Sequence, residues 1–327
     1  MSAFGFETTG QEVASTCSDA IRGKVILITG PSPSSLAAEF ARTIAVHGPS
    51  MIILASRDTS KLKPLVTSIK DTAPEVVTRL LTLDLASQDK IREAAKEVNA
   101  YEDVPHIDVL VNSAGLMAVP YGKTEEGIEL QFGTNHVGHF LFTNLIIGKL
   151  ISEDGRRTSR VVNVSSNGHE LSRVRFEDWN FGDGQYYNRW FAYGQSKTAN
   201  ILFSQALAAR LAKMGVISVS LHPGAIGSTN LSSHLGKEDW EGLGEIACNL
   251  GLPQFNGGFR FKTEEQGAAT YVFAAFHESI TDETNGRYLE NSQIVDFKNY
   301  KCWARDSVEA EELWKLSERL VGQVFKY

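Results

Sequence analysis

A phenol and an ammonium group lie one helical turn apart in this sequence, at Tyr193 and Lys197. Residues four apart share one face of a helix, so the two groups are expected to act on the same point. Ser165 and Ser166 end the preceding apolar run, at what would be the same edge of a sheet. Hydroxyl groups that converge on one oxygen atom are typical of general acid–base chemistry at a carbonyl or an alcohol. The Tyr–Lys spacing alone is common by chance, so its weight comes from its position in the fold.

Short apolar runs alternate with amphipathic stretches along the chain. The runs are rich in β-branched residues and apolar at consecutive positions, which is typical of strands buried on both faces of a parallel sheet. The alternation predicts an α/β fold of the Rossmann type, a doubly wound parallel sheet of about seven strands with helices on both faces. The expected strands span 25–29, 51–55, 78–83, 107–111, 161–164, 217–221 and 287–290. The expected helices span 36–46, 60–70, 87–98, 127–150, 192–213, 264–277 and 307–320.

No repeat, low-complexity tract or flexible linker divides the sequence, so residues 23–327 are predicted to form one domain that ends in the helix at 307–320. Residues 1–22 are expected to be an N-terminal tail with a short helix, which Thr9 and Glu12 begin with a capping box. Two long insertions interrupt the alternation, at 167–190 and 225–262. Such insertions at strand ends usually build the site of an open α/β sheet, and 225–262 is expected to be a mobile substrate loop.

The first expected strand leads into a turn and a helix with the sequence ILITGPSPSSLAAEF. A helix N-terminus at this place offers N–H groups to a phosphate. Of the glycines that let a backbone approach a pyrophosphate, only Gly30 is present. Ser32, Ser34 and Ser35 offer hydroxyl donors, and Leu36 stands near the expected place of the last glycine. A phosphate-binding loop and an ordinary β-to-α turn both remain open at this point.

Arg57 follows the second expected strand, where the ribose of an adenosine would bind. A carboxylate at this place selects NAD through the 2′-hydroxyl, whereas a cation suits the 2′-phosphate of NADP. Asp58 is expected to cap the next helix instead. Arg57 therefore indicates NADP, and a solvated loop arginine is the other interpretation.

The composition argues against several other functions. A net charge of −7 without a block of like charges gives no basis for binding nucleic acid or an anionic membrane. Cys17, Cys248 and Cys302 are too far apart for a disulfide framework, and no apolar run approaches the ~20 residues of a membrane span. The first residues lack the basic and apolar regions of a signal peptide. We therefore expect a cytoplasmic protein.

His136 and His139 lie three apart on an expected helix, a spacing that can indicate a metal site. No carboxylate or cysteine joins them in the sequence. We therefore expect no metal, and a packing role for both histidines.

Taken together, the motifs resemble the short-chain dehydrogenase/reductase family, and within it the branch similar to retinol dehydrogenases and WW-domain oxidoreductases. The resemblance covers roughly residues 23–290, with the motifs in the family's order and spacing. These motifs are Thr29-Gly30, Asp84-Leu85, Asn112-Ser113-Ala114-Gly115, Asn135-His136-Val137-Gly138-His139-Phe140, Val164-Ser165-Ser166, Tyr193 to Lys197, and His222-Pro223-Gly224.

The resemblance implies catalytic roles for four residues. Tyr193 would be the general acid of carbonyl reduction or the base of alcohol oxidation, with its pKa lowered by Lys197 and by the nicotinamide. Ser166 would bond the substrate oxygen, with Ser165 as its nearest rival. Lys197 would also hold the nicotinamide ribose, and Asn135 would position a water in a proton relay behind it.

The resemblance also implies a set of cofactor contacts. Asp84 would meet the adenine, Asn112 the adenosine side, and Ile226 with Ser228 the nicotinamide amide. The remaining cofactor-binding positions are Gly30, Ser32, Ser34, Ser35, Leu36, Arg57, Leu85, Ala114, Tyr193, Lys197, Pro223 and Gly224.

These roles predict an NADP(H)-dependent oxidoreductase that transfers a hydride to or from the nicotinamide, with reduction favoured because cells keep NADPH reduced. The family also suggests a homodimer through the helix at 192–213. The missing glycines keep a second class open, a non-redox scaffold or an isomerase or cyclase on the same fold.

Seven aromatic residues precede Tyr193 in and just after the first insertion. They either wall a large, flat, apolar pocket or pin the insertion onto the body of the protein. The first interpretation predicts a lipophilic alcohol or ketone, such as a terpenoid, polyketide or steroid-like compound of secondary metabolism. The seven are Phe176, Trp179, Phe181, Tyr186, Tyr187, Trp190 and Phe191.

Overall fold

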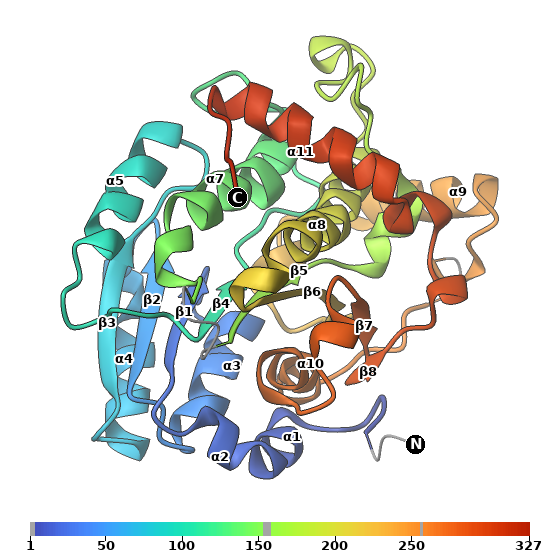
Figure 1. The fold of residues 1–327 in the computed structure, drawn as a ribbon. Helices are drawn as coiled ribbons and strands as arrows, with labels where there is room; N and C mark the ends of the chain where they lie inside the picture. Colours follow the sequence, from blue (N-terminus) through green and yellow to red (C-terminus); the bar gives the residue numbers. More distant parts are fainter. Residues whose placement is uncertain (1–3, 153–157, 256–257) are drawn as a thin grey trace.

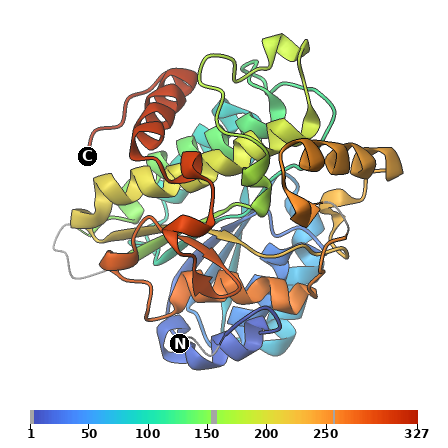
Figure 2. The same ribbon diagram turned by 90° about the vertical axis from the view of Figure 1, so that its right-hand side faces the viewer.

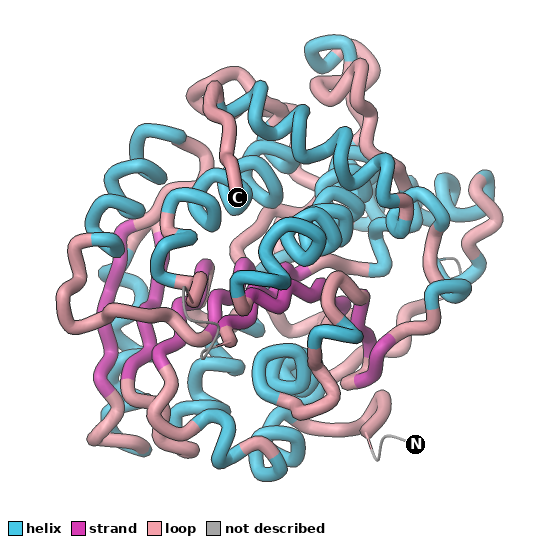
Figure 3. Tube along the Cα trace, in the orientation of Figure 1, coloured by secondary structure: helices cyan, strands magenta, loops and turns pink. Residues whose placement is uncertain are grey.

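One sheet runs through the centre of the protein (Figure 1, Figure 3). The computed structural model describes residues 4–152, 158–255 and 258–327, and within them the sheet has eight strands in the order β3-β2-β1-β4-β5-β6-β7-β8. Neighbouring strands are parallel except for β7 and β8. This confirms the doubly wound α/β fold, and β8 adds a strand to the seven expected. The strands are β1 (Val25–Thr29), β2 (Met51–Ser56), β3 (Val77–Thr82), β4 (Val109–Asn112), β5 (Ser159–Val164), β6 (Val216–His222), β7 (Tyr288–Glu290) and β8 (Gln293–Ile294).

The central strands read as continuous apolar runs because both of their faces are buried. In β1, Ile26 and Ile28 point into one apolar core, and Leu27 points into the other. Neighbouring β2 divides in the same way. The strand order reverses between β1 and β4, and open α/β sheets bind their ligands at such a reversal.

Helices form a layer on each side of the sheet (Figure 1, Figure 2). One layer holds α1 (Gly10–Thr16), α2 (Ser18–Ile21), α3 (Leu36–Ala45), α4 (Lys63–Thr72) and α10 (Glu264–Phe276). The other holds α5 (Gln88–Asn99), α6 (Leu130–Phe132), α7 (Gly138–Leu145), α8 (Arg189–Leu211) and α11 (Ser307–Val321). The remaining helix, α9 (Lys237–Asn249), belongs to the insertion between β6 and α10 and packs in a separate apolar cluster.

The helix expected over 127–150 is interrupted around Asn135. α6 passes into a π-helical turn, η2 (Gly133–Val137), and α7 follows. Gly138 ends this turn where the chain crosses close to Leu85, since a Cβ atom at Gly138 would lie 2.5 Å from the Leu85 carbonyl oxygen. A π turn displaces carbonyl groups from the regular helical pattern, and such turns are frequent at functional sites.

The N-terminal segment packs onto the body of the protein. Thr9 and Glu12 form the expected capping box, and α1 lies against α10 and α3. Ahead of this helix, Glu7 pairs with Arg260, and the Phe6 ring centre lies 3.9 Å from the Arg260 guanidinium carbon. The segment therefore contacts the far end of the insertion at 225–262.

The predicted C-terminal helix is confirmed as α11, which packs along α8 (Figure 1). Trp314 contacts the rings of Phe140 and Phe203. Arg210 of α8 pairs with Glu311 of α11 at 2.5 Å. The helix that the sequence suggested as a dimer contact is therefore covered by the chain itself along this side.

Candidate active site

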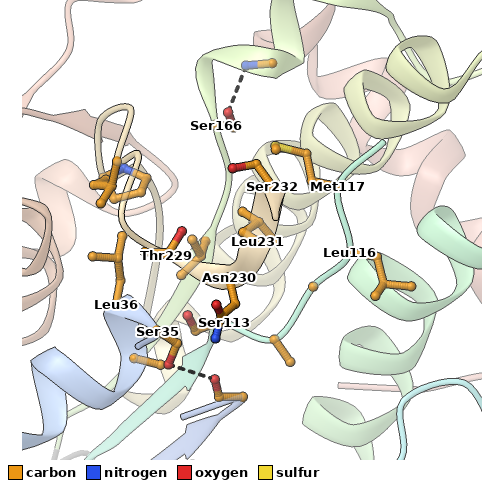
Figure 4. Close-up of a pocket in the computed structure, with 18 of the residues that line it drawn as sticks. Ser35, Leu36, Ser113, Leu116, Met117, Ser166, Thr229, Asn230, Leu231 and Ser232 are labelled. Carbon is orange, nitrogen blue, oxygen red and sulfur yellow. Dashed lines mark hydrogen bonds between the residues drawn. The ribbon is translucent and has the colours of Figure 1, made fainter. Parts of the chain in front are cut away.

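A cavity of about 620 Å³ opens at the carboxyl edge of the sheet. Figure 4 shows Ser35 and Leu36 toward one end of this pocket and Ser166 at the other, with Leu231, Ser232 and Met117 between them. Most of the predicted site residues line this one cavity. They are Gly30, Ser32, Ser34, Ser35, Leu36, Arg57, Leu85, Ala114, Ser166, Tyr193, Lys197, Pro223, Gly224 and Ile226.

The turn after β1 follows a path that would favour glycine at two positions. Gly30 has a φ angle of 72°, and a Cβ atom there would lie 2.6 Å from the Ala114 Cα atom. Ser34 also lies in the left-handed region, with φ at 58°, where a side chain costs conformational energy. Ser35 then caps α3, because its hydroxyl accepts the Ala38 N–H at 3.1 Å. The turn thus brings a helix N-terminus and serine hydroxyls to the cavity without the missing glycines.

Arg57 lines the same end of the cavity, and its side chain is exposed. Its neighbour Asp58 pairs with Lys61 and caps the next helical turn by accepting the Ser60 N–H at 3.1 Å. Asp58 therefore does not neutralise the Arg57 guanidinium. An exposed guanidinium beside a helix N-terminus suits a phosphate group.

Tyr193 and Lys197 line the opposite end of the cavity from the first turns of α8. The Lys197 nitrogen lies 5.5 Å from the centre of the Tyr193 ring and donates to the Val164 carbonyl oxygen at 3.0 Å. Asn188 caps α8 by accepting two backbone N–H groups, which fixes where this helix begins. The phenol and the ammonium group therefore share one helical face beside the end of β5.

The two serines that end β5 have different partners. Ser165 is buried and donates its hydroxyl to the Lys197 carbonyl oxygen at 2.7 Å. Ser166 accepts the Gly168 N–H at 3.0 Å (Figure 4). Its hydroxyl also lowers the pKa of the Tyr193 phenol through a side-chain hydrogen bond. Ser165 thus fastens α8 to the sheet, whereas Ser166 lies beside the Tyr193 phenol in the cavity lining.

Burial changes the ionisation of both central groups. Desolvation raises the pKa of Tyr193 to about 12, although the Ser166 hydroxyl acts in the opposite sense. Desolvation also lowers the pKa of Lys197 to about 8. The lowered Tyr193 pKa that the resemblance implies is not found in the protein alone, because burial of the phenolate outweighs the effect of the Ser166 hydroxyl. At neutral pH the phenol keeps its proton and most of the ammonium charge remains.

Asn135 lies in the π turn and does not line the cavity. Its side chain is buried, accepts the Leu116 N–H at 2.7 Å and donates to the Leu116 carbonyl oxygen at 2.8 Å. It also donates to the Ser196 hydroxyl at 2.9 Å. A Cβ atom at Gly115 would lie 3.1 Å from Asn135 Oδ1 and 3.6 Å from Lys197 Nζ, so both side chains lie next to this glycine.

Three other predicted cofactor residues also lie outside the cavity lining. Asp84 accepts the Ala86 N–H at 3.1 Å in the turn before α5. Asn112 is buried and donates to the Asn163 side chain at 2.8 Å. Ser228 donates to Glu264 at 2.9 Å. Each side chain has a local partner that the sequence pattern does not reveal, and their cofactor contacts stay predictions.

The apolar wall of the cavity comes mainly from the second insertion. All seven aromatic residues near the first insertion are described in the structure, and of these Trp190 alone lines the cavity. Phe181, for example, is buried against Tyr187 within the insertion itself. The interpretation that these aromatics wall the pocket is therefore wrong for six of the seven. The residues that do form the wall include Leu231, Trp240, Leu243, Phe255, Phe259 and Phe261.

Sequence reasoning also missed Tyr271, which reaches the cavity from α10. Its hydroxyl lies 3.0 Å from the Ser113 hydroxyl, at the end of β4. No local pattern indicates this contact, because the two residues are 158 positions apart. The α9 residues of the cavity wall could have been found from the sequence, because they lie in an amphipathic stretch of the second insertion.

The two spaced histidines have separate partners. His136 Nε2 lies 2.7 Å from the Ser317 hydroxyl of α11, and His139 Nε2 lies 2.8 Å from the Thr29 hydroxyl of β1. Throughout the described residues, no three His, Cys, Asp or Glu side chains are grouped so that they could hold a metal. Helices of the described part of the chain are all too short or too polar to cross a membrane.

Comparison with known proteins gives consistent results. The sequence profile of the family described as short chain dehydrogenase matches residues 24–179. Retinol dehydrogenase 11 of Homo sapiens is 35% identical over 300 residues, which cover 92% of this chain and 86% of that protein. The chloroplastic short-chain dehydrogenase TIC 32 A of Brassica napus is also 35% identical, over 98% of this chain and 95% of its own.

Solved structures share the fold. An uncharacterised protein from Mycobacterium paratuberculosis superposes with a TM-score of 0.69 at 32% identity, covering 94% of this chain and 96% of that one. The NADPH-bound carbonyl reductase from chicken fatty liver superposes with a TM-score of 0.59 at 16% identity, covering 84% of this chain and 100% of that one. At that identity the second likeness concerns the fold alone.

Proposed function

Because the chain belongs to the short-chain dehydrogenase family, in the retinol dehydrogenase branch, we propose that it is an NADP(H)-dependent oxidoreductase that interconverts a lipophilic ketone and its alcohol. One observation carries the proposal. A single cavity takes in Arg57 and the N-terminus of α3 at one end, and Ser166, Tyr193 and Lys197 at the other. A dinucleotide enzyme needs its phosphate contacts and its reactive groups within one cleft.

The residues at the phosphate end fit NADP(H). Gly30, Ser32 and Ser34 of the turn line the cavity, and Ser35 caps α3 there. Arg57 provides a cation that Asp58 does not neutralise, which favours a 2′-phosphate over a plain ribose. When bound, the cofactor supplies or accepts the hydride at C4 of its nicotinamide ring.

Tyr193 acts as the general acid in the reduction. Its raised pKa keeps the phenol protonated at neutral pH, so it can pass a proton to the substrate oxygen as the carbon receives the hydride. Ser166 donates a hydrogen bond to the same oxygen and stabilises its developing negative charge. The nearby Lys197 ammonium stabilises the phenolate that remains. The fixed side chain of Asn135 holds the loop that faces Lys197.

The lining of the cavity supports an uncharged, apolar substrate. Arg57 and Lys197 are the charged residues among those that line it, and both lie where the cofactor would bind. Trp190, Trp240 and Phe259 give the remaining part an aromatic wall. The names of the retinol dehydrogenase relatives are consistent with such a substrate. Reduction is the proposed direction, because cells keep NADPH reduced.

Two further expectations stay proposals. A homodimer through α8 would have to form beside α11 or displace it, because Arg210 and Glu311 join the two helices. Size-exclusion chromatography with light scattering decides between monomer and dimer. Fractionation of cells that produce the protein tests the cytoplasmic location.

Calorimetric titration of the purified protein with NADPH and then NADH tests the proposed function. We expect NADPH to bind more tightly than NADH, and Arg57→Ala to weaken NADPH binding by about tenfold or more. Lys61→Ala is the matched control, because this exposed cation lies in the next helical turn and pairs with Asp58. Failure of the wild-type protein to bind either nucleotide would leave the scaffold or the isomerase as the better hypothesis.

A further inference from the structure

His139 occupies a fully enclosed position between the turn that follows β1 and the π turn that contains Asn135. The side chain is 1% exposed. Its Nε2 atom lies 2.8 Å from the Thr29 hydroxyl, directly before Gly30. Its Nδ1 atom lies 2.9 Å from the main-chain carbonyl oxygen of Asn135. Both ring nitrogens are therefore engaged, one on the cofactor side and one on the catalytic side.

The hydrogen-bond network determines which nitrogen carries the proton. The Asn135 carbonyl oxygen can only accept, so Nδ1 must be the donor of that bond. Burial lowers the pKa of His139 to about 4, so the ring is neutral and Nε2 carries no proton. Nε2 therefore accepts from the Thr29 hydroxyl, whose oxygen accepts the N–H groups of Ser113 and Ala114 at 2.9 and 3.0 Å.

From Asn135 the network continues to the catalytic helix. The Asn135 side chain bonds Leu116 twice and donates to the Ser196 hydroxyl at 2.9 Å. Ser196 in turn donates to the Tyr193 carbonyl oxygen at 2.8 Å. A continuous set of hydrogen bonds thus runs from Thr29 through His139 and Asn135 to the turn of α8 that carries Tyr193.

We propose that His139 is a positioning residue that holds two segments in register, each through one ring nitrogen. These segments are the turn after β1, which contains Gly30, and α8, the helix that carries Tyr193. The inference rests on the proposed function. On the Thr29 side, the ring fixes the hydroxyl that supports the Ser113–Ala114 backbone, against which Gly30 packs. On the Asn135 side, the ring satisfies the carbonyl of the π turn and so fixes the asparagine next to Lys197.

Two conservative substitutions separate these roles. In His139→Asn, the amide lies where Nδ1 was, so it keeps the bond to the Asn135 carbonyl and loses the partner of Thr29. In His139→Gln, the amide reaches the position of Nε2, so it keeps Thr29 and leaves the Asn135 carbonyl without its donor. We expect His139→Asn to weaken NADPH binding about tenfold with a smaller change in kcat. We expect His139→Gln to lower kcat about tenfold with near-normal NADPH binding.

His136 provides the matched control three residues earlier in the same segment. It is equally buried, and its Nε2 bonds Ser317, whose hydroxyl donates to the Leu313 carbonyl oxygen at 2.7 Å. His136 therefore carries its proton on Nε2, the tautomer opposite to that of His139, and its partners lie in α11. His136→Asn and His136→Gln should lower the melting temperature and leave kcat and the NADPH Kd within about twofold of the wild type.

Two measurements keep the inference testable if the His139 variants are too unstable to study. Histidine ¹⁵N spectra of the wild-type protein should show His139 as a neutral ring protonated on Nδ1. Thr29→Val, which removes the partner of Nε2 and leaves His139 in place, should by itself weaken NADPH binding about tenfold with a smaller change in kcat.

Two results overturn the inference alone. One is that the wild-type protein binds NADPH while the His139 variants, like the His136 variants, lose only stability and keep the wild-type kcat and NADPH Kd. The other is a His139 ring protonated on Nε2. A wild-type protein that binds neither NADPH nor NADH overturns the proposed function, and this inference with it.

Discussion

Arg189 and Asp239 form an ion pair that joins α8, the helix that carries Tyr193 and Lys197, to α9, which contributes to the apolar wall of the cavity. The neighbouring side chains strengthen this connection. Trp190 donates its indole N–H to the Asp239 carbonyl oxygen at 2.9 Å, and its ring centre lies 5.4 Å from that of Trp240. The position of the apolar wall is therefore tied to the same helical turns that present Tyr193.

This pair gives a first prediction about the substrate. Asp239→Asn removes the charge but keeps an oxygen for the Gly236 N–H that the side chain now accepts at 2.9 Å. We expect the KM for a lipophilic ketone to rise roughly three- to tenfold, because the wall loses its attachment, with little change in NADPH binding. Steady-state kinetics measures both values. Glu241→Gln is the control on the same helix, where an exposed carboxylate pairs with Lys237. An unchanged KM for the ketone would contradict the prediction.

A second prediction concerns the proton donor. Tyr193→Phe keeps the ring and removes the hydroxyl, so turnover should fall by about 100-fold or more, as expected for loss of a general acid. NADPH binding should remain, because the variant keeps the charge of Lys197. Single-turnover kinetics and calorimetry measure the two effects. Tyr186→Phe is the control, because this ring is 64% exposed in the first insertion. Equal activity of the two variants would contradict the proposed mechanism.

A third prediction concerns the upper limit of pH. Burial lowers the pKa of Lys197 to about 8, so the cation is lost as the pH rises through this value. NADPH binding and ketone reduction should both be weaker at pH 9 than at pH 7. Tyr193, with a pKa of about 12, keeps its proton over this range. Lys197→Arg should keep its charge at pH 9 and so remove most of the decline in NADPH affinity, even if turnover is lower at both pH values.

A fourth prediction concerns stability in acid. Burial lowers the pKa of His136 and His222 to about 3, and that of His139 and His169 to about 4. These histidines take up protons near pH 6.5 when unfolded but not when folded, so the stability that they contribute is lost as the pH falls below 6.5. Glu129 acts in the opposite sense, because burial raises its pKa to about 7 and the folded protein keeps its proton near pH 5.

For these five groups the balance is a net uptake of about three protons on unfolding near pH 5, equivalent to up to about 4 kcal/mol per pH unit. Urea unfolding at pH 7, 6 and 5 measures this slope. His136→Gln should reduce it by about one proton, which separates the histidine effect from general acid denaturation. Equal stability at pH 7 and pH 5 would contradict the prediction.

The parts of the fold that follow from local pattern could be predicted from the sequence. The strands are continuous apolar runs because they are buried on both faces, and Tyr193 with Lys197 follows directly from helical geometry. The path of the turn at Ser34 could not be predicted, because a serine with positive φ is stabilised by the rest of the structure. The contact of Tyr271 with Ser113 likewise depends on the packing of two distant segments.

The aromatic residues before Tyr193 illustrate the same limit. An insertion rich in aromatic residues has the same amino-acid composition whether its rings face a ligand or pack against each other, so the composition does not tell the two cases apart. The structure turns Phe181 and Tyr187 inward, and the wall of the cavity comes from α9 and the chain that follows it. Which insertion covers the site is decided by tertiary contacts such as the Arg189–Asp239 pair.

The contact of Glu7 and Phe6 with Arg260 has a practical consequence for anyone who produces the protein. Arg260 directly precedes Phe261, which belongs to the apolar wall of the cavity. An affinity tag fused to the N-terminus, or a recombinant form trimmed to begin at α1, alters a segment that supports this end. Substrate screens should therefore compare N-tagged and C-tagged preparations before an inactive result is assigned to the compound.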